Sequence, residues 1–127
     1  MNLFPAIAAI LLVAACAAPP KDIRSTAPAL TASLPNLPIA AARCIQGRFE
    51  RKGSSQYPPL RTRTLDTPPN TEIGVIVDNG IGAVADLEPT AGGSSVAFRV
   101  GNLHPSPSTL VERFKESVVE CGGQVGP

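Results

Sequence analysis

The sequence predicts a small α+β domain with the order α-β-β-β-α, in which two helices cover one face of a three-stranded antiparallel meander. Hydrophobic and polar residues alternate through three consecutive segments between residues 71 and 102, which is the period of half-buried strands. A segment with helical spacing lies on each side of this block. Each of these segments carries one cysteine, Cys44 or Cys121, and we expect a disulfide to join the two helices.

Composition limits both the size of the domain and the kind of partner it binds. The chain has 127 residues and a formal net charge of +1, which argues against nucleic acid because its binders carry a marked basic excess. Fourteen prolines and 11 glycines indicate a loop-rich chain. We expect a single folded domain at residues 38–123, a tail at 124–127 and no cofactor.

The first 16 residues determine where the protein is expected to reside. Residues 3–16, LFPAIAAILLVAAC, are uncharged and mostly apolar, but too few for the roughly 20 residues of a membrane-spanning helix. Such a run is typical of a signal peptide. Val13-Ala14-Ala15-Cys16 resembles the lipobox of bacterial lipoproteins, a branched aliphatic residue and two small residues before a cysteine. An ordinary secretory signal peptide is the alternative.

The resemblance implies that residues 1–15 are removed and that acyl chains on Cys16 anchor the protein in a membrane. Two or more acyl chains hold a protein stably on a bilayer. Ala17 follows the cysteine, where the enteric sorting rule has Asp in proteins retained in the inner membrane. The resemblance therefore favours the outer membrane, with the domain facing the periplasm.

Residues 16–37 contain the lipidated cysteine and are otherwise rich in Ala, Pro, Ser and Thr, without a sustained apolar period. This composition predicts a flexible tether. It would span about 25 Å as a coil and at most about 60 Å if extended. We therefore expect the domain to stand clear of the lipid headgroups.

The first predicted helix begins at Pro38 and ends before residues 53–55, Gly-Ser-Ser. Ala41, Ile45 and Phe49 fall on one face, with Cys44 beside them. Residues 56–70 then form an irregular, proline-containing connection, in which residues 60–64 can form a short edge strand.

The three predicted strands span residues 71–78, 81–88 and 94–101. Asn79-Gly80 predicts a type I′ hairpin turn between the first two, because both central residues of that turn need positive φ. Pro89 to Gly93 forms the second turn. The closing helix follows a loop that contains His104, places Leu110, Phe114, Val118 and Cys121 on one stripe, and stops at Gly122-Gly123.

The cysteine pair has a structural and a catalytic interpretation. With Cys16 lipidated, Cys44 and Cys121 are the two that remain, and an exported chain meets an oxidising compartment, which favours a disulfide. In the chain-entropy model, closing this loop of 77 residues contributes roughly 4.5 kcal/mol. The alternative is a reactive thiol at either position with His104 as its base. Two distant cysteines and a single histidine do not match the spacing of zinc ligands.

Other candidate motifs have ordinary structural explanations. Residues 80–85, GIGAVA, fit the G-x-G-x-x-A form of a dinucleotide-binding turn, but Pro89 truncates the helix that such a turn must open. Gly92-Gly93-Ser94-Ser95 lacks the G-x-S-x-G spacing of a nucleophile elbow. Asp86 and Glu88 share a strand face and are candidates for binding a cation or for a solvated side of the sheet.

Charge is segregated along the sequence. Residues 66–88 contain five acidic and no basic side chains, whereas residues 43–63 contain six basic side chains against Glu50. A basic surface of this kind binds an acidic envelope protein or anionic lipid headgroups, and the alternative is a solvated helix and loop. The predicted basic surface consists of Arg43, Arg48, Arg51, Lys52, Arg61 and Arg63.

These features predict a non-enzymatic envelope lipoprotein. Its expected parts are an acyl anchor, a tether and a disulfide-linked domain that binds another envelope component through the basic surface or an open edge of the sheet. One alternative is a small periplasmic thiol-active protein or hydrolase that uses Cys44 or Cys121 with His104. Another is a purely structural spacer.

Overall fold

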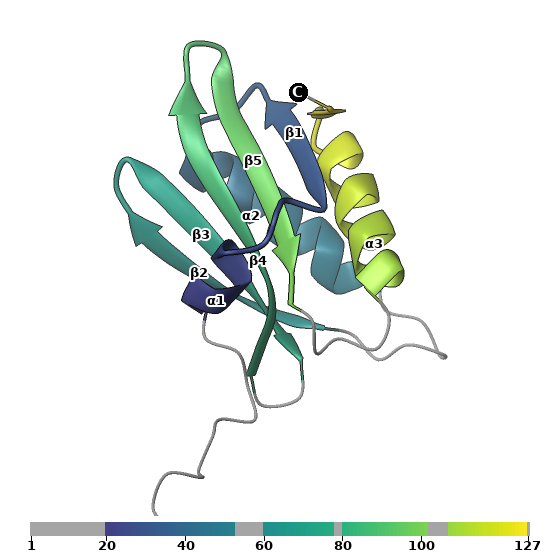
Figure 1. Cartoon of the computed structure of the whole chain (residues 1–127). Coiled ribbons are helices and arrows are strands. Elements are labelled where there is room, and N and C mark those ends of the chain that lie inside the picture. The colour runs from purple at the N-terminus through teal and green to yellow at the C-terminus, as the bar shows by residue number, and fades with distance from the viewer. Residues whose placement is uncertain (1–19, 53–59, 78–79, 102–106, 127) are drawn as a thin grey trace, which may run out of the picture.

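The computed structural model describes residues 20–52, 60–77, 80–101 and 107–126. They form one antiparallel sheet of six strands in the order β2-β3-β4-β5-β1-β6, together with three helices (Figure 1). The helices are α1 (Pro20–Arg24), α2 (Pro38–Arg51) and α3 (Pro107–Glu120). The strands are β1 (Leu30–Leu34), β2 (Arg61–Thr67), β3 (Asn70–Val77), β4 (Gly80–Thr90), β5 (Gly93–Val100) and β6 (Gln124–Val125).

The predicted three-stranded α-β-β-β-α fold is therefore wrong. The expected meander is present as β3, β4 and β5, but it is the middle of a wider sheet. β2 extends it on one side, and β1 and β6 extend it on the other. The short edge strand expected within residues 60–64 is instead seven residues long, and all seven pair with β3.

The largest correction concerns the segment expected to be a tether. β1 lies within it and pairs with β5 over all five of its residues, from Leu30 opposite Phe98 to Leu34 opposite Ser94. Ala32 and Leu34 are buried, whereas Thr31 and Ser33 are exposed. This alternation is that of a strand with one buried face. The residues from 30 onward are thus part of the folded domain.

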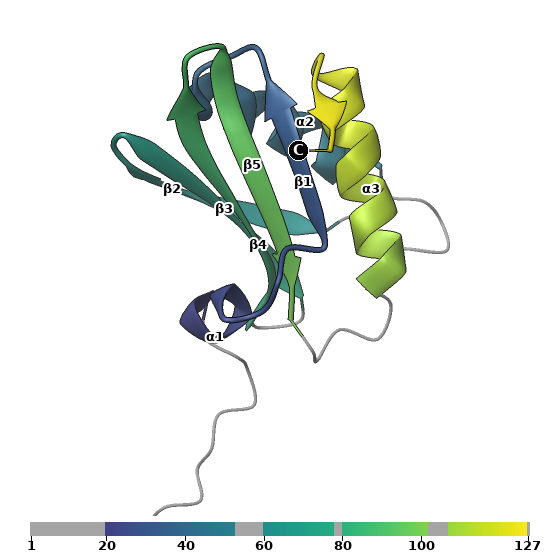
Figure 2. The same ribbon diagram turned by 45° about the horizontal axis from the view of Figure 1, so that its top comes forward.

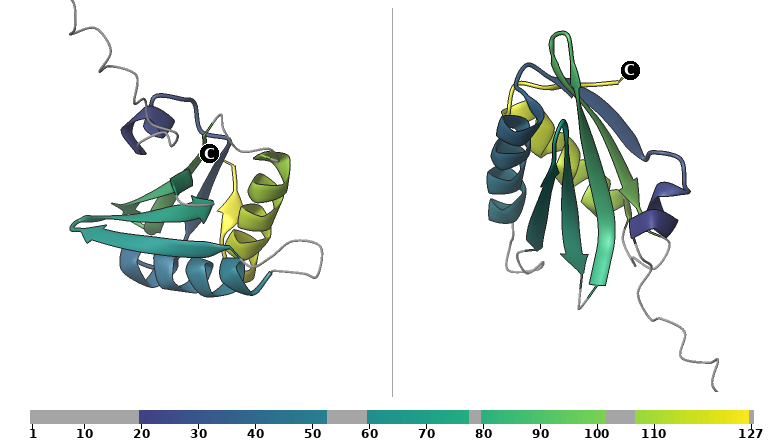
Figure 3. Two further views of the ribbon diagram at one scale, coloured as in Figure 1. Left: turned by 90° about the horizontal axis from the view of Figure 1, so that it is seen from below. Right: turned by 90° about the vertical axis from the view of Figure 1, so that its left-hand side faces the viewer.

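Two helices cover one face of the sheet and the third lies on the other. Seen from the side, the sheet stands between α2 and α3 on one face and α1 on the opposite face (Figure 3), and a tilted view shows α1 at one end of the strands (Figure 2). The core lies under α2 and α3. At its centre the Phe98 and Phe114 rings stack with centroids 4.1 Å apart, and Phe49 meets Phe114 edge-on at 6.3 Å.

The predicted disulfide between Cys44 and Cys121 is confirmed, with the two Cα atoms 6.0 Å apart. It connects the middle of α2 to the residue after α3. Arg113 makes a second connection, since its Nε and Nη2 donate to the Phe49 carbonyl oxygen at 3.0 and 2.8 Å. Its guanidinium also lies 4.7 Å from the centroid of the Phe49 ring. Burial lowers the pKa of Arg113, and the cation complements the negative end of α2.

A close backbone contact joins β5 to the corner between β1 and α2. Gly93, the first residue of β5, has φ of +143°, and a Cβ there would lie 2.1 Å from the Leu34 carbonyl oxygen. The Ser94 hydroxyl donates to the Asn36 carbonyl oxygen beside it. The turn residue Gly93 was predicted from sequence, but its contact with β1 was not.

Candidate functional site

The sheet has a polar face opposite α2 and α3, which we call the open face. Alternation along each strand assigns residues to it: Ile73, Val75, Ala85 and Phe98 pack in the core, so their neighbours point the other way. The open face consists of Arg61, Arg63, Leu65, Glu72, Gly74, Val84, Asp86, Glu88, Ser95, Ala97, Arg99, Thr31 and Ser33.

Helix α1 packs against one end of the open face. Ile23 is only 1 % exposed although it lies outside the main core. Its side chain lies beside Gly101, where a Cβ would be 3.4 Å from Cγ1 of Ile23. Val84 is fully buried on the open face, and α1 contacts both β4 and β5. Ile23 therefore anchors α1 to the sheet.

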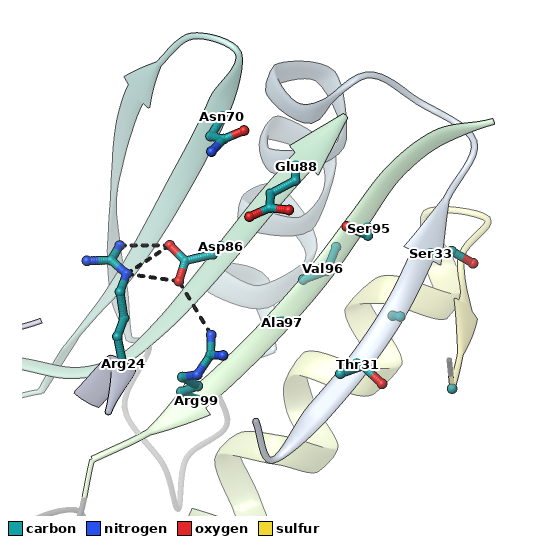
Figure 4. A pocket seen from close by; sticks show the side chains of 12 residues that line it. Arg24, Thr31, Ser33, Asn70, Asp86, Glu88, Ser95, Val96, Ala97 and Arg99 are labelled. Atoms are coloured by element: carbon teal, nitrogen blue, oxygen red, sulfur yellow. Dashed lines mark hydrogen bonds and ion pairs between the residues drawn. The ribbon is translucent and has the colours of Figure 1, made fainter. Parts of the chain in front are cut away.

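An ion-pair network extends this contact (Figure 4). Arg24 pairs with Glu72. It also pairs with Asp86, through an Nη2 to Oδ1 distance of 2.7 Å that Figure 4 marks with a dashed line. The second arginine, Arg99, lies 3.6 Å from the other oxygen of Asp86 and donates from Nε to the Thr26 carbonyl oxygen at 2.9 Å. The pKa of Arg24 is raised, mainly by its hydrogen bond to Asp86. The network fixes the segment from α1 to Thr26 on the open face.

A shallow hollow of about 740 Å³ lies beside this network. Its lining combines the charged side chains of the network with small ones, among them Thr31, Ser33 and Ser95, and Glu88 and Asn70 lie at its side (Figure 4). Asp86, one of the two predicted cation ligands, is engaged by Arg24 and Arg99. Among the described residues no three His, Cys, Asp or Glu side chains gather where they could hold a metal ion.

The predicted basic residues do not form one surface. Arg43, Arg48 and Arg51 are exposed on α2. Arg61 and Arg63 are exposed on the open face, and therefore point away from the face that α2 covers. Both groups lie near β2, because Gln46 of α2 donates to the Thr62 hydroxyl at 2.9 Å.

Lys52 forms ion pairs with two glutamates of α3 and therefore adds no free charge to the predicted basic surface. Its Nζ lies 2.7 Å from a carboxylate oxygen of Glu120 and 3.5 Å from one of Glu116. The hydrogen bond to Glu120 raises the pKa of Lys52. Since its charge is neutralised by this pair, Lys52 serves the packing of α2 on α3.

Strand register arranges the open-face charges along the strand direction. Arg63 pairs with Gly74, which pairs with Val84, which pairs with Arg99. Glu72 and Asp86 form the next row of the open face, and Glu88 lies one row beyond Asp86. The open face is thus basic toward the end that α1 covers and acidic farther along the strands.

Several predicted residues lie outside the described part of the chain, namely Val13 to Cys16, Asn79 and His104. Sequence reasoning missed the roles of Arg24 and Arg99. No local signal could have found the main pairs of Arg24, because Glu72 and Asp86 lie 48 and 62 residues away in sequence.

Within the described residues, no helix is both long and apolar enough to cross a membrane. Comparisons with protein-family models, with curated proteins and with solved structures found no match to this chain.

Proposed function

We propose that this protein is a non-enzymatic bacterial envelope lipoprotein, which acyl chains on Cys16 hold in the outer membrane and which binds another component in the periplasm. The observation that carries the proposal is the Cys44–Cys121 disulfide. Disulfides persist in oxidising compartments and are rare in the bacterial cytosol. The disulfide therefore supports export, which is what the lipobox-like sequence Val13 to Cys16 predicts.

The same disulfide argues against the thiol-active alternative. Each of the two cysteines is bonded to the other, so neither is a free nucleophile in this state.

The partner site that we propose is the outer edge of β2. This strand pairs with β3 alone, and no described strand pairs with its other side. Its first outward backbone donor, the Thr62 N–H, faces the Glu50 carboxylate at 3.4 Å. Since backbone directions alternate in an antiparallel pair, the Thr64 N–H points the same way, outward. The unpaired backbone groups along this edge favour an extended partner segment that adds a strand to the sheet.

The anchor is tested by the intact mass of the protein made in a bacterial host with its own signal. We expect a species that begins at Cys16, carries the added mass of acyl chains and gains two hydrogens on reduction. A Cys16→Ser variant should remain unprocessed and unacylated. A wild-type species without acyl mass would exclude the membrane anchor, and a mass unchanged by reductant would reopen the thiol-active alternative.

The edge site is tested by blocking the outward donor with Thr64→Pro. Proline is tolerated on an edge strand when its missing N–H faces outward, so the β2–β3 pairing should survive. A photoreactive residue at the exposed Leu65 should crosslink to a partner in the native host, and Thr64→Pro should abolish that adduct. Thr64→Val is the matched control, because it keeps the N–H and removes a buried hydroxyl that has no partner among the described residues. Identical adducts in both variants would disprove an edge-binding mode.

A further inference from the structure

The length of chain between the anchor and the fold is much shorter than the sequence suggested. Cys16 and Pro20, the first residue of α1, are four residues apart. Four residues reach at most about 14 Å, even when fully extended. The tether expected at residues 16–37 is therefore reduced to the short linker between Cys16 and Pro20. This step rests on the proposed acylation of Cys16.

This linker is followed by a segment that packs against the sheet. Ile23 is buried against it, Arg24 is paired with Glu72 and Asp86, and Arg99 donates to the Thr26 carbonyl oxygen. The Ala29 N–H then donates to the Phe98 carbonyl oxygen at 2.8 Å, directly before β1 begins. The domain therefore cannot swing far about its anchor, and the end of the sheet that carries α1 stays close to the bilayer.

Strand register identifies which other residues lie at this end. Ile23 packs beside Gly101, whose N–H donates to the Gly82 carbonyl oxygen at 2.8 Å. In the neighbouring strands the corresponding row runs through Ile76, which pairs with Ile81 and with Arg61. Helix α2 ends here as well, because Glu50 in its last turn reaches the Thr62 backbone. Arg51, Arg61 and Arg63 thus lie at the membrane-facing end.

The charge at this end is complementary to an anionic bilayer. Arg51, Arg61 and Arg63 are exposed and form no ion pair with any described residue. The acidic residues of the open face lie farther along the strands. Asp22 of α1 and Glu50 in the last turn of α2 also lie at this end and offset part of this positive charge.

We propose that this basic end rests on the bilayer, with Arg51, Arg61 and Arg63 bound to the phosphates of anionic lipid headgroups. Basic residues near an anionic surface each strengthen membrane attachment about fivefold. Such a contact fixes the orientation of the domain. It leaves the turn between β4 and β5, around Gly92, pointing into the periplasm (Figure 1).

The experiment uses the acylated protein in vesicles and two single-tryptophan variants, since the natural chain has no Trp. Ile81→Trp reports from the basic end. Gly92→Trp is the matched control at the other end of β4, where a Cβ meets no atom within 4 Å. The two positions are 11 residues apart along an extended hairpin strand, roughly 35 Å. The quencher is a spin label on the lipid headgroup, in phosphatidylcholine mixed two to one with phosphatidylglycerol.

We expect quenching at position 81 and none at position 92. Arg51→Gln, Arg61→Gln and Arg63→Gln together should weaken the quenching at position 81, because only the short connection to Cys16 then holds this end near the bilayer, while the protein stays on the vesicles. Equal quenching at the two positions would overturn the orientation. Quenching that is unchanged by the three substitutions, or equally strong in pure phosphatidylcholine, would overturn the arginine–lipid contact. An acidic protein would then be the partner expected for these arginines. Failure of the proposed acylation has a separate signature, because the protein would then not float with the vesicles in either lipid.

Discussion

Replacing both Cys44 and Cys121 by alanine is expected to lower the free energy of unfolding by about 3 to 5 kcal/mol. The bond closes a loop with a sequence separation of 77 residues, which includes β2, β3, β4 and β5. In the chain-entropy account the loss comes mostly from the unfolded chain, which becomes free to expand. For a domain of this size, the melting temperature should fall by about 15 °C or more. Urea unfolding followed by circular dichroism measures the change.

Reduction provides the matched control for this prediction. The wild-type protein in reductant should unfold at the same urea concentration as the double alanine variant, and reductant should not affect the variant. A variant that loses less than about 1 kcal/mol would mean that Arg113, Lys52 and the core already hold α2 and α3 together without the bond. Since net stabilities of small domains are about 5 to 15 kcal/mol, the expected loss is a large fraction of the total.

The sequence predicted the parts of the fold whose signals are local. The alternation of Ile73, Val75 and Val77 predicted β3, and the stripe from Leu110 to Cys121 predicted α3. The disulfide followed from the two helices and the expected compartment. For β3 and α3, the pattern of large apolar side chains is long enough to specify the element before any tertiary contact forms.

β1 escaped prediction because its local signal is weak. It has five residues, and its two buried side chains are Ala32 and Leu34, set among Ser, Thr and Pro. Its structure depends on β5, more than 60 residues later, and on the glycine at position 93 that lets the two backbones meet. Tertiary pairing of this kind overrides composition, and no window of neighbouring residues contains it.

For the candidate site, the sequence predicted a separation of basic and acidic residues but not their arrangement in space. The segregation of basic and acidic residues was visible in the sequence, but the strand register that turns it into a polarity along the open face was not. Lys52 was grouped with the arginines because nothing near it in sequence indicates Glu120. The burial of Ile23 and the ion pair of Arg24 with Asp86 likewise had no signal in the local sequence.

Phe114→Ala is expected to destabilise the domain by about 3 to 5 kcal/mol, because it empties the centre of a core with few large side chains. Phe114 is 1 % exposed and stacks on Phe98, which is fully buried. It also meets the edge of Phe49, whose carbonyl holds Arg113. The chain has four phenylalanines, one tyrosine and no tryptophan, and three of these phenylalanines meet here. Among the described residues no further aromatic side chain is left to fill the space.

Two controls on the same helix separate this effect from a general loss of α3. Val119→Ala changes a side chain that is 55 % exposed and should cost less than about 0.5 kcal/mol. Phe114→Leu keeps most of the buried volume, loses the aromatic contacts and should cost about 1 to 2 kcal/mol. A Phe114→Ala loss no larger than that of Phe114→Leu would show that the neighbouring side chains collapse into the cavity. In that case the disulfide and Arg113, rather than the aromatic cluster, would fix α3 on the sheet.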